Sequence, residues 1–385
     1  MYTRFLEPPK SAFLLFGPRG TGKSTWIRNN FLGAHVINLL PPEQTLTYKK
    51  NPSQLRAEVL ALSRDRWVFV DEVQRVPELL DEVHYLMEEA NHRKFGLTGS
   101  SARKLKHGAA NLLAGRAKVR HLFPLNSADL EFAISVEQLI AYGCLPLSVT
   151  AENEREREDF LRSYVNVYLH EEVKSESLVR NIGSFSRFLE VSALLGGQKI
   201  NLSNVALNAQ ITRDTARGYF SILEDTLIGS WLPAYRPRSK VKEVSHPKFY
   251  WFDSGVLFAA AGGFEQPLGR DVYGILFEHF IHHELKSYLA YSGTRGSLGY
   301  WATPSGSEVD FVWWYGSQVV AIEVKYSKSY RSDHKKGLLS FRSGTKARLI
   351  IVYLGEKELQ VDDIEVMPVQ TFLRKLHHGS ILHTS

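Results

Sequence analysis

The chain has 385 residues, 44% of them hydrophobic, and carries a formal net charge of +6. This length exceeds the ~100–200 residues that one ordinary core uses, so we expect several domains. A single cysteine, Cys144, excludes an internal disulfide framework, and no apolar run approaches the roughly 20 residues of a bilayer-spanning helix. The composition favours a cytoplasmic protein, and its positive charge suits an anionic partner such as nucleic acid, although such charge also serves plain solubility.

The first motif follows a short apolar run at residues 11–16, and a helix-compatible segment begins at Thr25. It fits the P-loop pattern G-x-x-x-x-G-K-S and reads Gly17-Pro18-Arg19-Gly20-Thr21-Gly22-Lys23-Ser24. Glycines let consecutive backbone N–H groups surround phosphates, and the helix N-terminus adds partial positive charge. We predict that this loop binds ATP, that Lys23 contacts the β- and γ-phosphates, and that Ser24 binds Mg²⁺. A chance glycine-rich turn is the alternative.

A second apolar run, residues 67–70, ends in two acids, Asp71 and Glu72. This pattern is typical of a buried parallel strand that ends at an active-site edge. Asp71 is predicted to anchor the Mg²⁺ shell and Glu72 to polarise the attacking water, a role more typical of a hydrolase than of a small-molecule kinase. An ordinary solvated strand end is the alternative.

A third predicted strand, residues 94–97, leads into Thr98-Gly99-Ser100-Ser101. Hydroxyl side chains at this place could bind the γ-phosphate or the water, and we take Ser100 as a nucleotide-binding residue. Two more strands are predicted at residues 35–40 and 119–125. Five strands with helices between them predict a three-layer parallel α/β sheet over residues 1–125.

This order of elements resembles the AAA+ ATPases. More narrowly, residues 97–102 (LTGSSA) and 113–117 (LAGRA) resemble a bacterial and archaeal family that joins an AAA+ module to a C-terminal restriction-endonuclease-like domain. The resemblance implies a homo-oligomer, with a hexameric ring as one form. It also implies a catalytic arginine supplied by a neighbouring subunit, for which Arg116 is the first candidate and Arg103 the second. A surface arginine in a basic stretch is the alternative for both.

The middle of the chain is predicted to be helical. Residues 126–180 are acidic and aromatic, which favours a helical lid or connector without chemistry of its own. Residues 181–262 resemble a winged helix-turn-helix, with helices at 188–195, at 202–208 and from the N-cap Thr212 to residue 227, and with residues 248–252 in the wing.

Two arginines of this middle region could contact DNA. Arg213 and Arg217 lie at the start of the recognition-like helix, and a basic tether follows at residues 236–242. Protein docking is an equally common use of such modules, so both partners stay open.

The segment 307–325 is predicted to be a β-hairpin. Gly316-Ser317 fits a two-residue type II′ turn, which sets Asp310 opposite Glu323 and Glu308 opposite Lys325. Because side chains alternate along strands, all four are expected on one face. Facing carboxylates about 5 Å apart repel unless a cation neutralises them. The hairpin therefore predicts a divalent metal site, with Lys325 placed to activate water or stabilise charge on phosphate.

Asp310 followed by Glu323-x-Lys325 resembles the PD-(D/E)xK nucleases. The surrounding order also matches that fold: a helix at 272–289, a strand at 298–301, the hairpin, a helix at 334–341 and a strand at 347–354. The resemblance adds Glu278 of the first helix as a metal ligand, whereas Val309 stands where proline is frequent. A solvated face balanced by a Glu308–Lys325 ion pair, and a fold that has lost activity, are the alternatives.

The predicted fold class is thus α/β, with an AAA+ P-loop sheet (1–125), a helical lid (126–180), a winged helix (181–262) and a restriction-endonuclease-like α/β domain (263–385). The predicted function is ATP hydrolysis coupled to a Mg²⁺- or Mn²⁺-dependent endonuclease that acts on structured or single-stranded DNA. The alternative is a nucleotide-driven DNA- or protein-binding switch with an inactive nuclease fold. The adjacent histidines His282-His283 and His377-His378 point to different helix faces, so we expect no shared metal there.

Overall fold

The computed structural model describes residues 2–89, 94–100, 116–169, 181–236, 246–266, 268–269 and 271–382. The chain forms two compact units. The N-terminal unit comprises Leu6–Pro124 and Asp225–Ile228, and the C-terminal unit comprises Met1–Phe5, Leu125–Glu224 and Gly229–Ser385. The predicted domain boundaries at residues 125, 180 and 262 stay predictions. Within the described residues, no helix is long and apolar enough to cross a membrane.

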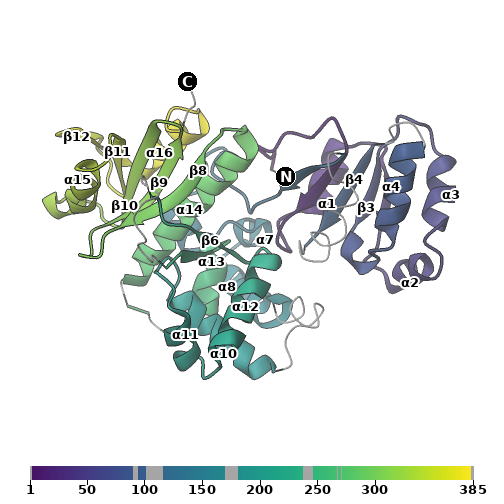
Figure 1. Cartoon of the computed structure of the whole chain (residues 1–385), viewed down its shortest axis with the longest axis horizontal. Coiled ribbons are helices and arrows are strands. Elements are labelled where there is room, and N and C mark those ends of the chain that lie inside the picture. Colours follow the sequence, from purple (N-terminus) through teal and green to yellow (C-terminus); the bar gives the residue numbers. More distant parts are fainter. Residues whose placement is uncertain are drawn as a thin grey trace. The chain divides into compact units, whose positions relative to one another are not determined.

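The N-terminal unit is built on a five-stranded sheet in the order β2-β3-β4-β1-β5, in which every neighbouring pair is parallel (Figure 1). All five predicted strands are confirmed: β1 (Phe13–Phe16), β2 (His35–Asn38), β3 (Val68–Asp71), β4 (Phe95–Gly99) and β5 (Lys118–His121). The helices between them are α1 (Lys23–Asn30), α2 (Pro42–Lys50), α3 (Gln54–Leu60), the 3₁₀ turn η1 (Val73–Arg75) and α4 (Leu79–Glu89).

Both faces of this sheet are covered, as the continuous apolar strands require. On one face, Phe13 packs against Trp26 of α1 and against Phe31. On the other, Leu14 and Val70 join a buried cluster with side chains of α2, α3 and α4. The predicted three layers are therefore present.

The first half of the C-terminal unit is mainly helical. Its elements are α6 (Val136–Tyr142), α7 (Pro146–Thr150), α8 (Glu154–Ser163), the π-helical η2 (Tyr164–Leu169), α10 (Ile182–Leu194), α11 (Leu202–Asn208), α12 (Arg213–Asp225), β6 (Gly229–Leu232), β7 (Lys248–Trp251) and α13 (Ser254–Ala260). Thr212 caps α12 as predicted, because its hydroxyl accepts the N–H of Thr215 at 3.1 Å. Helix α10 begins earlier than expected, since Asn181 caps it by accepting the N–H of Ser184.

Strand β7, which covers most of the predicted wing segment 248–252, is a buried strand. It pairs antiparallel with β6, and all four of its residues are buried. Phe249 packs against Phe220 of α12 and Trp231 of β6, so the strand lies inside the unit. Its side chains are consequently available to the neighbouring sheet rather than to a surface ligand.

The second half of the C-terminal unit is a six-stranded mixed sheet in the order β12-β13-β11-β10-β9-β8. Its elements are α14 (Asp271–Ser292), β8 (Ser297–Ala302), β9 (Glu308–Tyr315), β10 (Gln318–Lys325), η3 (Ser332–Lys335), α15 (Lys336–Arg342), β11 (Arg348–Tyr353), β12 (Leu359–Val361), β13 (Ile364–Pro368) and α16 (Val369–His377). The predicted order from α14 to β11 is confirmed, and β12, β13 and α16 extend it. Strands β10, β11 and β13 run parallel, whereas β8, β9 and β10 are antiparallel.

Candidate functional site

The P-loop connects the end of β1 to the start of α1. Gly20 and Gly22 have positive φ angles of 83° and 91°, which side chains rarely adopt. A Cβ on Gly17 would lie 2.3 Å from the carbonyl oxygen of Leu122. The glycines of the motif are thus required by the backbone path itself.

Lys23 lies across this loop. Its Nζ donates hydrogen bonds to the carbonyls of Gly17, at 2.7 Å, and Pro18, at 3.2 Å, and the residue is only 6% exposed. Thr21 closes the same turn by donating to the Pro18 carbonyl at 2.9 Å. The ammonium group is therefore held inside the loop, where the motif predicts the phosphates.

Ser24 and Asp71 come together as predicted. Ser24 Oγ donates to Asp71 Oδ2 at 2.7 Å, and Thr98 Oγ1 donates to the other oxygen of the same carboxylate. Asp71 is buried, at 4% exposure. Hydroxyl and carboxylate oxygens are ligands that Mg²⁺ prefers, so Ser24 and Asp71 fit the metal of a bound Mg–ATP.

Glu72 is positioned by an unusual backbone conformation. Its φ of 61° and ψ of 43° are left-handed, a conformation that costs non-glycine residues about 1–3 kcal/mol and is frequent at functional sites. Its N–H donates to Thr98 Oγ1 at 3.1 Å. Ser100 Oγ lies 3.4 Å from Glu72 Oε2, so the predicted acid and the predicted Ser100 are brought together.

Sequence reasoning missed Gln74. Its amide nitrogen donates to the Glu72 carboxylate and also to Ser100 Oγ, at 3.1 Å. The only signal was its place two residues after the acid pair. The η1 turn that brings it back toward Glu72 is set by tertiary packing of the buried Val73.

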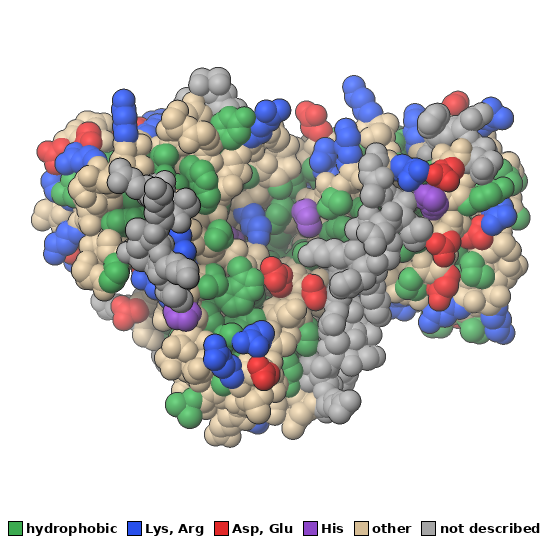
Figure 2. All heavy atoms as spheres, in the orientation of Figure 1, with side chains coloured by type: hydrophobic (Ala, Val, Ile, Leu, Met, Phe, Trp, Pro, Cys, Tyr) green, Lys and Arg blue, Asp and Glu red, His purple; other side chains and the backbone are tan. Residues whose placement is uncertain are grey.

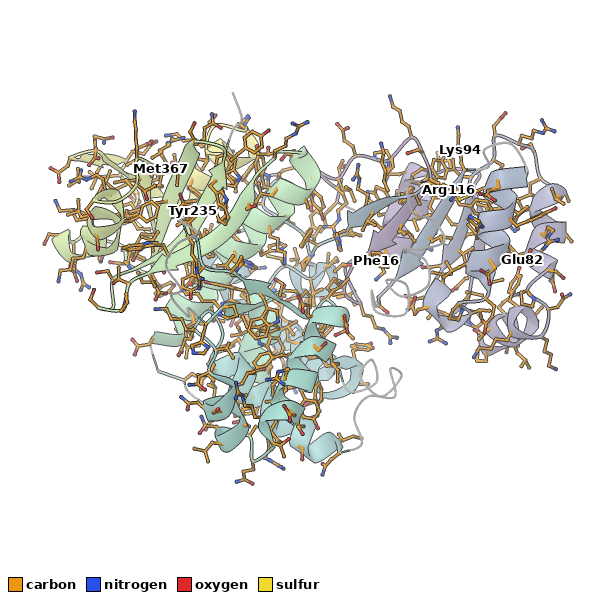
Figure 3. The ribbon with its side chains drawn as sticks, viewed as in Figure 1. Phe16, Glu82, Lys94, Arg116, Tyr235 and Met367 are labelled. Carbon is orange, nitrogen blue, oxygen red and sulfur yellow. The ribbon has the colours of Figure 1, made fainter. Side chains whose placement is uncertain are left out.

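Arg116 lies at the opposite end of the sheet from the P-loop of its own chain. It precedes β5, whose Lys118 pairs with Phe13 at the start of β1, whereas the P-loop follows Phe16 at its end (Figure 3). Its guanidinium pairs with Glu88 of α4. An action of Arg116 on a neighbouring subunit's site stays a prediction, and Arg103 lies outside the described residues. Arg19 is an exposed residue of the loop.

The predicted hairpin register is present in the C-terminal sheet. Tyr315 pairs with Gln318, and pairing continues to Phe311 with Ile322. Gly316 has a φ of 58°, as a type II′ turn requires. Beyond this ladder, Asp310 Oδ2 accepts the N–H of Val324 at 2.8 Å, so the aspartate side chain takes the place of a strand-to-strand bond.

The expectation that all four charged residues share one face is wrong. Gly299 of β8 pairs with Val312 of β9 and Trp301 pairs with Val309, so two residues of β9 lie opposite one of β8. Such a bulge interrupts side-chain alternation and re-aims the residues before it. Glu308 consequently pairs with Lys248, at 2.6 Å, and Lys199, at 2.9 Å, rather than with Lys325.

Lys325 instead pairs with the neighbouring catalytic candidate. Its Nζ donates to Glu323 Oε1 at 2.5 Å. Glu323 is buried, at 7% exposure, and its Oε2 has no hydrogen-bond partner. Burial and the carboxylate of Asp310 raise the pKa of Glu323 to about 8. Burial and the carboxylate of Glu278 raise the pKa of Asp310 to about 6.

Asp310 and Glu323 have the chemistry to hold one divalent cation, which stays a prediction. The pKa of each carboxyl is raised by burial and by a nearby carboxylate, and Glu323 Oε2 is buried without a hydrogen-bond partner. Oxygen donors of this kind suit Mg²⁺ or Mn²⁺.

Glu278 does not complete a three-carboxylate metal site. Its Oε1 accepts hydrogen bonds from Lys248 Nζ, at 3.1 Å, and from the hydroxyl of Tyr250. Across the part of the chain that the structure describes, no group of three or more His, Cys, Asp or Glu side chains is arranged to hold a metal ion. Lys248 occupies the place next to Glu278, so Glu278 is not grouped with Asp310 and Glu323 as the prediction requires.

The histidine pairs serve the core, apart from the exposed His378. His282 stacks on Tyr250, and His283 Nε2 lies 3.0 Å from the Leu125 carbonyl oxygen. His377 pairs with the buried Glu284 at 2.8 Å.

The predicted DNA contacts lie on the surface of α12. Arg213 and Arg217 are exposed, and Arg217 pairs with Asp214 at 3.0 Å. Figure 2 shows basic side chains gathered over the α10 to α12 part of this unit. Arg236 of the basic tether is described, whereas residues 237–242 lie outside the described residues.

Comparison with known proteins assigns each third of the chain separately. Residues 9–131 match a family model described as an AAA domain. Residues 134–267 and 273–372 match two models described as domains of unknown function, DUF8612 and DUF4143.

Relatives extend over most of the chain. Rv2008c of Mycobacterium tuberculosis is 26% identical over 362 residues, which cover 92% of this chain and 78% of that protein. MJ1544 of Methanocaldococcus jannaschii is 21% identical over 387 residues, with coverage of 90% and 81%. Among solved structures, the Walker-type ATPase PABY2304 of Pyrococcus abyssi is 17% identical and aligns over 65% of this chain and 90% of its own, with a TM-score of 0.42.

Proposed function

We propose that this chain, whose N-terminal unit is an AAA-type ATPase domain, couples ATP hydrolysis to metal-dependent cleavage of DNA by its C-terminal sheet. The ATPase assignment rests on the AAA match together with the joined P-loop and acid-pair residues, Ser24 and Asp71. Glu72, whose carboxylate accepts hydrogen bonds from Gln74 and Ser100, would polarise the attacking water.

The nuclease proposal is carried by the surroundings of Glu323, which lies beside Asp310 in the hairpin. Its Oε1 accepts a hydrogen bond from Lys325 Nζ at 2.5 Å, and its Oε2 is buried without a hydrogen-bond partner. A bound Mg²⁺ or Mn²⁺ would supply a water of lowered pKa and charge stabilisation at phosphate. Asp310 and Glu323 would hold it, while Lys325 would hold or move a proton of the water, or stabilise the phosphate. The element order from α14 to β11 supports a restriction-endonuclease-like fold for this part.

DNA is the proposed substrate because the chain carries a net positive charge and exposed arginines. The net charge of +6 and the exposed Arg213 and Arg217 suit a polyanion. The three helices α10, α11 and α12 followed by β6 and β7 have the order of a winged helix-turn-helix, which supports DNA binding by α12.

A nuclease panel tests the proposal. Wild type is incubated with single-stranded, duplex and branched DNA in Mg²⁺ or Mn²⁺, with and without ATP, beside Asp310→Asn and Lys325→Ala. Asp363→Asn is the matched control, because Asp363 is an exposed acid of the same sheet region that pairs with Arg342. We expect cleavage by wild type and the control only. Equal cleavage by wild type and Asp310→Asn on every substrate would contradict the nuclease.

A second function, a nucleotide-driven switch with an inactive nuclease fold, is favoured by the Lys248 contact with Glu278, since a resident cation can replace a metal there. It predicts ATP hydrolysis that Glu72→Gln abolishes, and no DNA cleavage. It also predicts that Mn²⁺ shifts the unfolding temperature of wild type and of Asp310→Asn by the same amount.

A further inference from the structure

The carboxylates of the candidate nuclease centre fall into two groups with different counter-charges. Glu278 and Glu308 converge on Lys248, at 3.1 and 2.6 Å. Asp310 and Glu323 are served by the Val324 N–H and by Lys325. The pair Glu278 and Glu308 is neutralised by the buried ammonium group of Lys248. The pair Asp310 and Glu323 keeps one carboxylate oxygen, Glu323 Oε2, without a hydrogen-bond partner.

Backbone hydrogen bonds fix the position of Lys248 in the chain. It begins β7, and its backbone forms an antiparallel bridge with Lys199. The N–H groups of Gly197 and Ile200 donate to the carbonyls on either side of it, Phe249 at 2.9 Å and Pro247 at 3.1 Å. Two short stretches of backbone thus fix the position from which its side chain reaches the carboxylates.

The surroundings keep this lysine charged. Its side chain is 2% exposed, and its Nζ lies 5.4 Å from the centre of the Tyr300 ring. Burial lowers the pKa of Lys248, but the carboxylate of Glu278 and its neighbours raise it well above the ordinary value. A buried ammonium is stable only when it is paired with carboxylates. Lys248 therefore needs Glu278 and Glu308 to remain charged, and the two glutamates need Lys248 in turn.

We propose that Lys248 is a built-in cation of the candidate nuclease centre, which holds Glu278 and Glu308 so that the centre takes one divalent cation, at Asp310 and Glu323, and not two. The inference rests on the proposed nuclease site. Lys248 is a positioning residue in this scheme: it belongs to the helical half of the unit and sets the charge of a site on the sheet half.

Metal counting tests this directly, with Mn²⁺ as the probe and full-length protein throughout. All variants carry Asp71→Asn, so that the Mg²⁺ residues of the ATPase site do not contribute. Calorimetric titration is expected to give one Mn²⁺ per chain, and none after Asp310→Asn. Glu278→Gln is expected to change the Mn²⁺ affinity less than about twofold, whereas loss of a true ligand lowers it ~10-fold or more.

Lys248→Met provides the opposite change. It frees Glu278 and Glu308, so a second Mn²⁺ is expected, and Lys248→Met/Glu278→Gln is expected to return the count to one. Lys199→Met is the matched control and keeps one Mn²⁺, because Lys199 is 37% exposed and contacts only Glu308 among these acids. Thermal unfolding verifies that each variant is folded. If Lys248→Met does not fold, the Mn²⁺ affinity of Glu278→Gln decides whether Glu278 is a metal ligand.

Two Mn²⁺ in the Asp71→Asn protein, or a tenfold loss of affinity in Glu278→Gln, would overturn the role of Lys248. The proposed function fails separately, if the counted Mn²⁺ survives Asp310→Asn or if no DNA is cleaved. One Mn²⁺ without cleavage therefore leaves the role of Lys248 standing and removes the nuclease.

Discussion

Gln74 positions the Glu72 carboxylate through a hydrogen bond: its amide nitrogen donates to Oε2 of Glu72 and, at 3.1 Å, to the hydroxyl oxygen of Ser100. Removing this amide leaves Glu72 free to turn away from the attacking water. Gln74→Ala is therefore expected to lower the kcat of ATP hydrolysis ~10-fold while the Kd for ATP stays within about twofold. Gln54→Ala, which removes a similar amide contact to Glu58, is the control. A matching loss of ATP affinity would show that Gln74 acts on binding instead.

Glu72 itself is expected to act after binding. Glu72→Gln keeps the size of the side chain and removes its basicity, so hydrolysis should fall by ~10²–10⁴-fold, while ATP binding persists. Glu78→Gln, an exposed acid six residues on, should hydrolyse ATP like wild type. Fluorescent-nucleotide binding and phosphate release measure the two quantities, and hydrolysis by Glu72→Gln at a wild-type rate would remove its assigned role.

Arg116 is expected to work across subunits. Arg116→Ala should lower hydrolysis ~10³-fold or more without changing ATP binding, whereas Arg64→Ala, an exposed arginine of the same unit, should not. Mixing Arg116→Ala with Lys23→Ala should restore hydrolysis that neither shows alone, because each supplies the group that the other lacks. Failure of the mixture to hydrolyse ATP, with assembly verified by light scattering, argues against a trans-acting Arg116.

Gly337 marks a close contact between α15 and β9. Alanine usually stabilises a helix over glycine by about 0.5–1 kcal/mol, but a Cβ here would lie 1.9 Å from the Glu308 carbonyl oxygen. Gly337→Ala is expected to destabilise the protein by about 1–3 kcal/mol. Gly344→Ala, whose Cβ would lie 3.9 Å from its nearest neighbour, is expected within about 0.5 kcal/mol of wild type. Urea unfolding compares them, and equal midpoints would mean that α15 shifts freely.

Glu284 is expected to make stability depend on pH. It accepts the N–H and hydroxyl of Ser127, at 2.8 and 2.7 Å, and pairs with His377. Burial raises its pKa, but the bond to His377 and the charges around it bring the pKa below the ordinary value. A lowered pKa contributes stability above the unfolded-state pKa of about 4.3, and this is lost as pH falls through the folded-state value.

The measurement is urea unfolding of wild type and Glu284→Gln at several pH values. The variant should be less stable by ~3 kcal/mol at pH 7, and the difference should shrink below about pH 4. Glu358→Gln, an exposed partner of Lys375, should cost under about 1 kcal/mol. A difference that grows on acidification contradicts the assigned charge state.

Sequence alone determined the features that depend on neighbouring residues. The P-loop and the acid pair were readable because backbone chemistry places their groups within a few positions of a strand end, and Ser24 and Asp71 do meet. The register of the hairpin was likewise set by two turn residues, since Gly316 adopts the positive φ that the turn needs.

Only the tertiary structure decided what lies beside these groups. A bulge opposite Tyr300 turned Glu308 away from Lys325. The residue pattern of β9 does not predict this bulge, because the bulge depends on how β8 packs. Lys248 reaches Glu278 from thirty residues before it, through β7 and its pairing with the 197–200 segment. Local pattern thus fixed which groups could bind ATP or a metal, whereas contacts between distant segments fixed their partners, because burial and charge depend on packing that spacing along the chain does not encode.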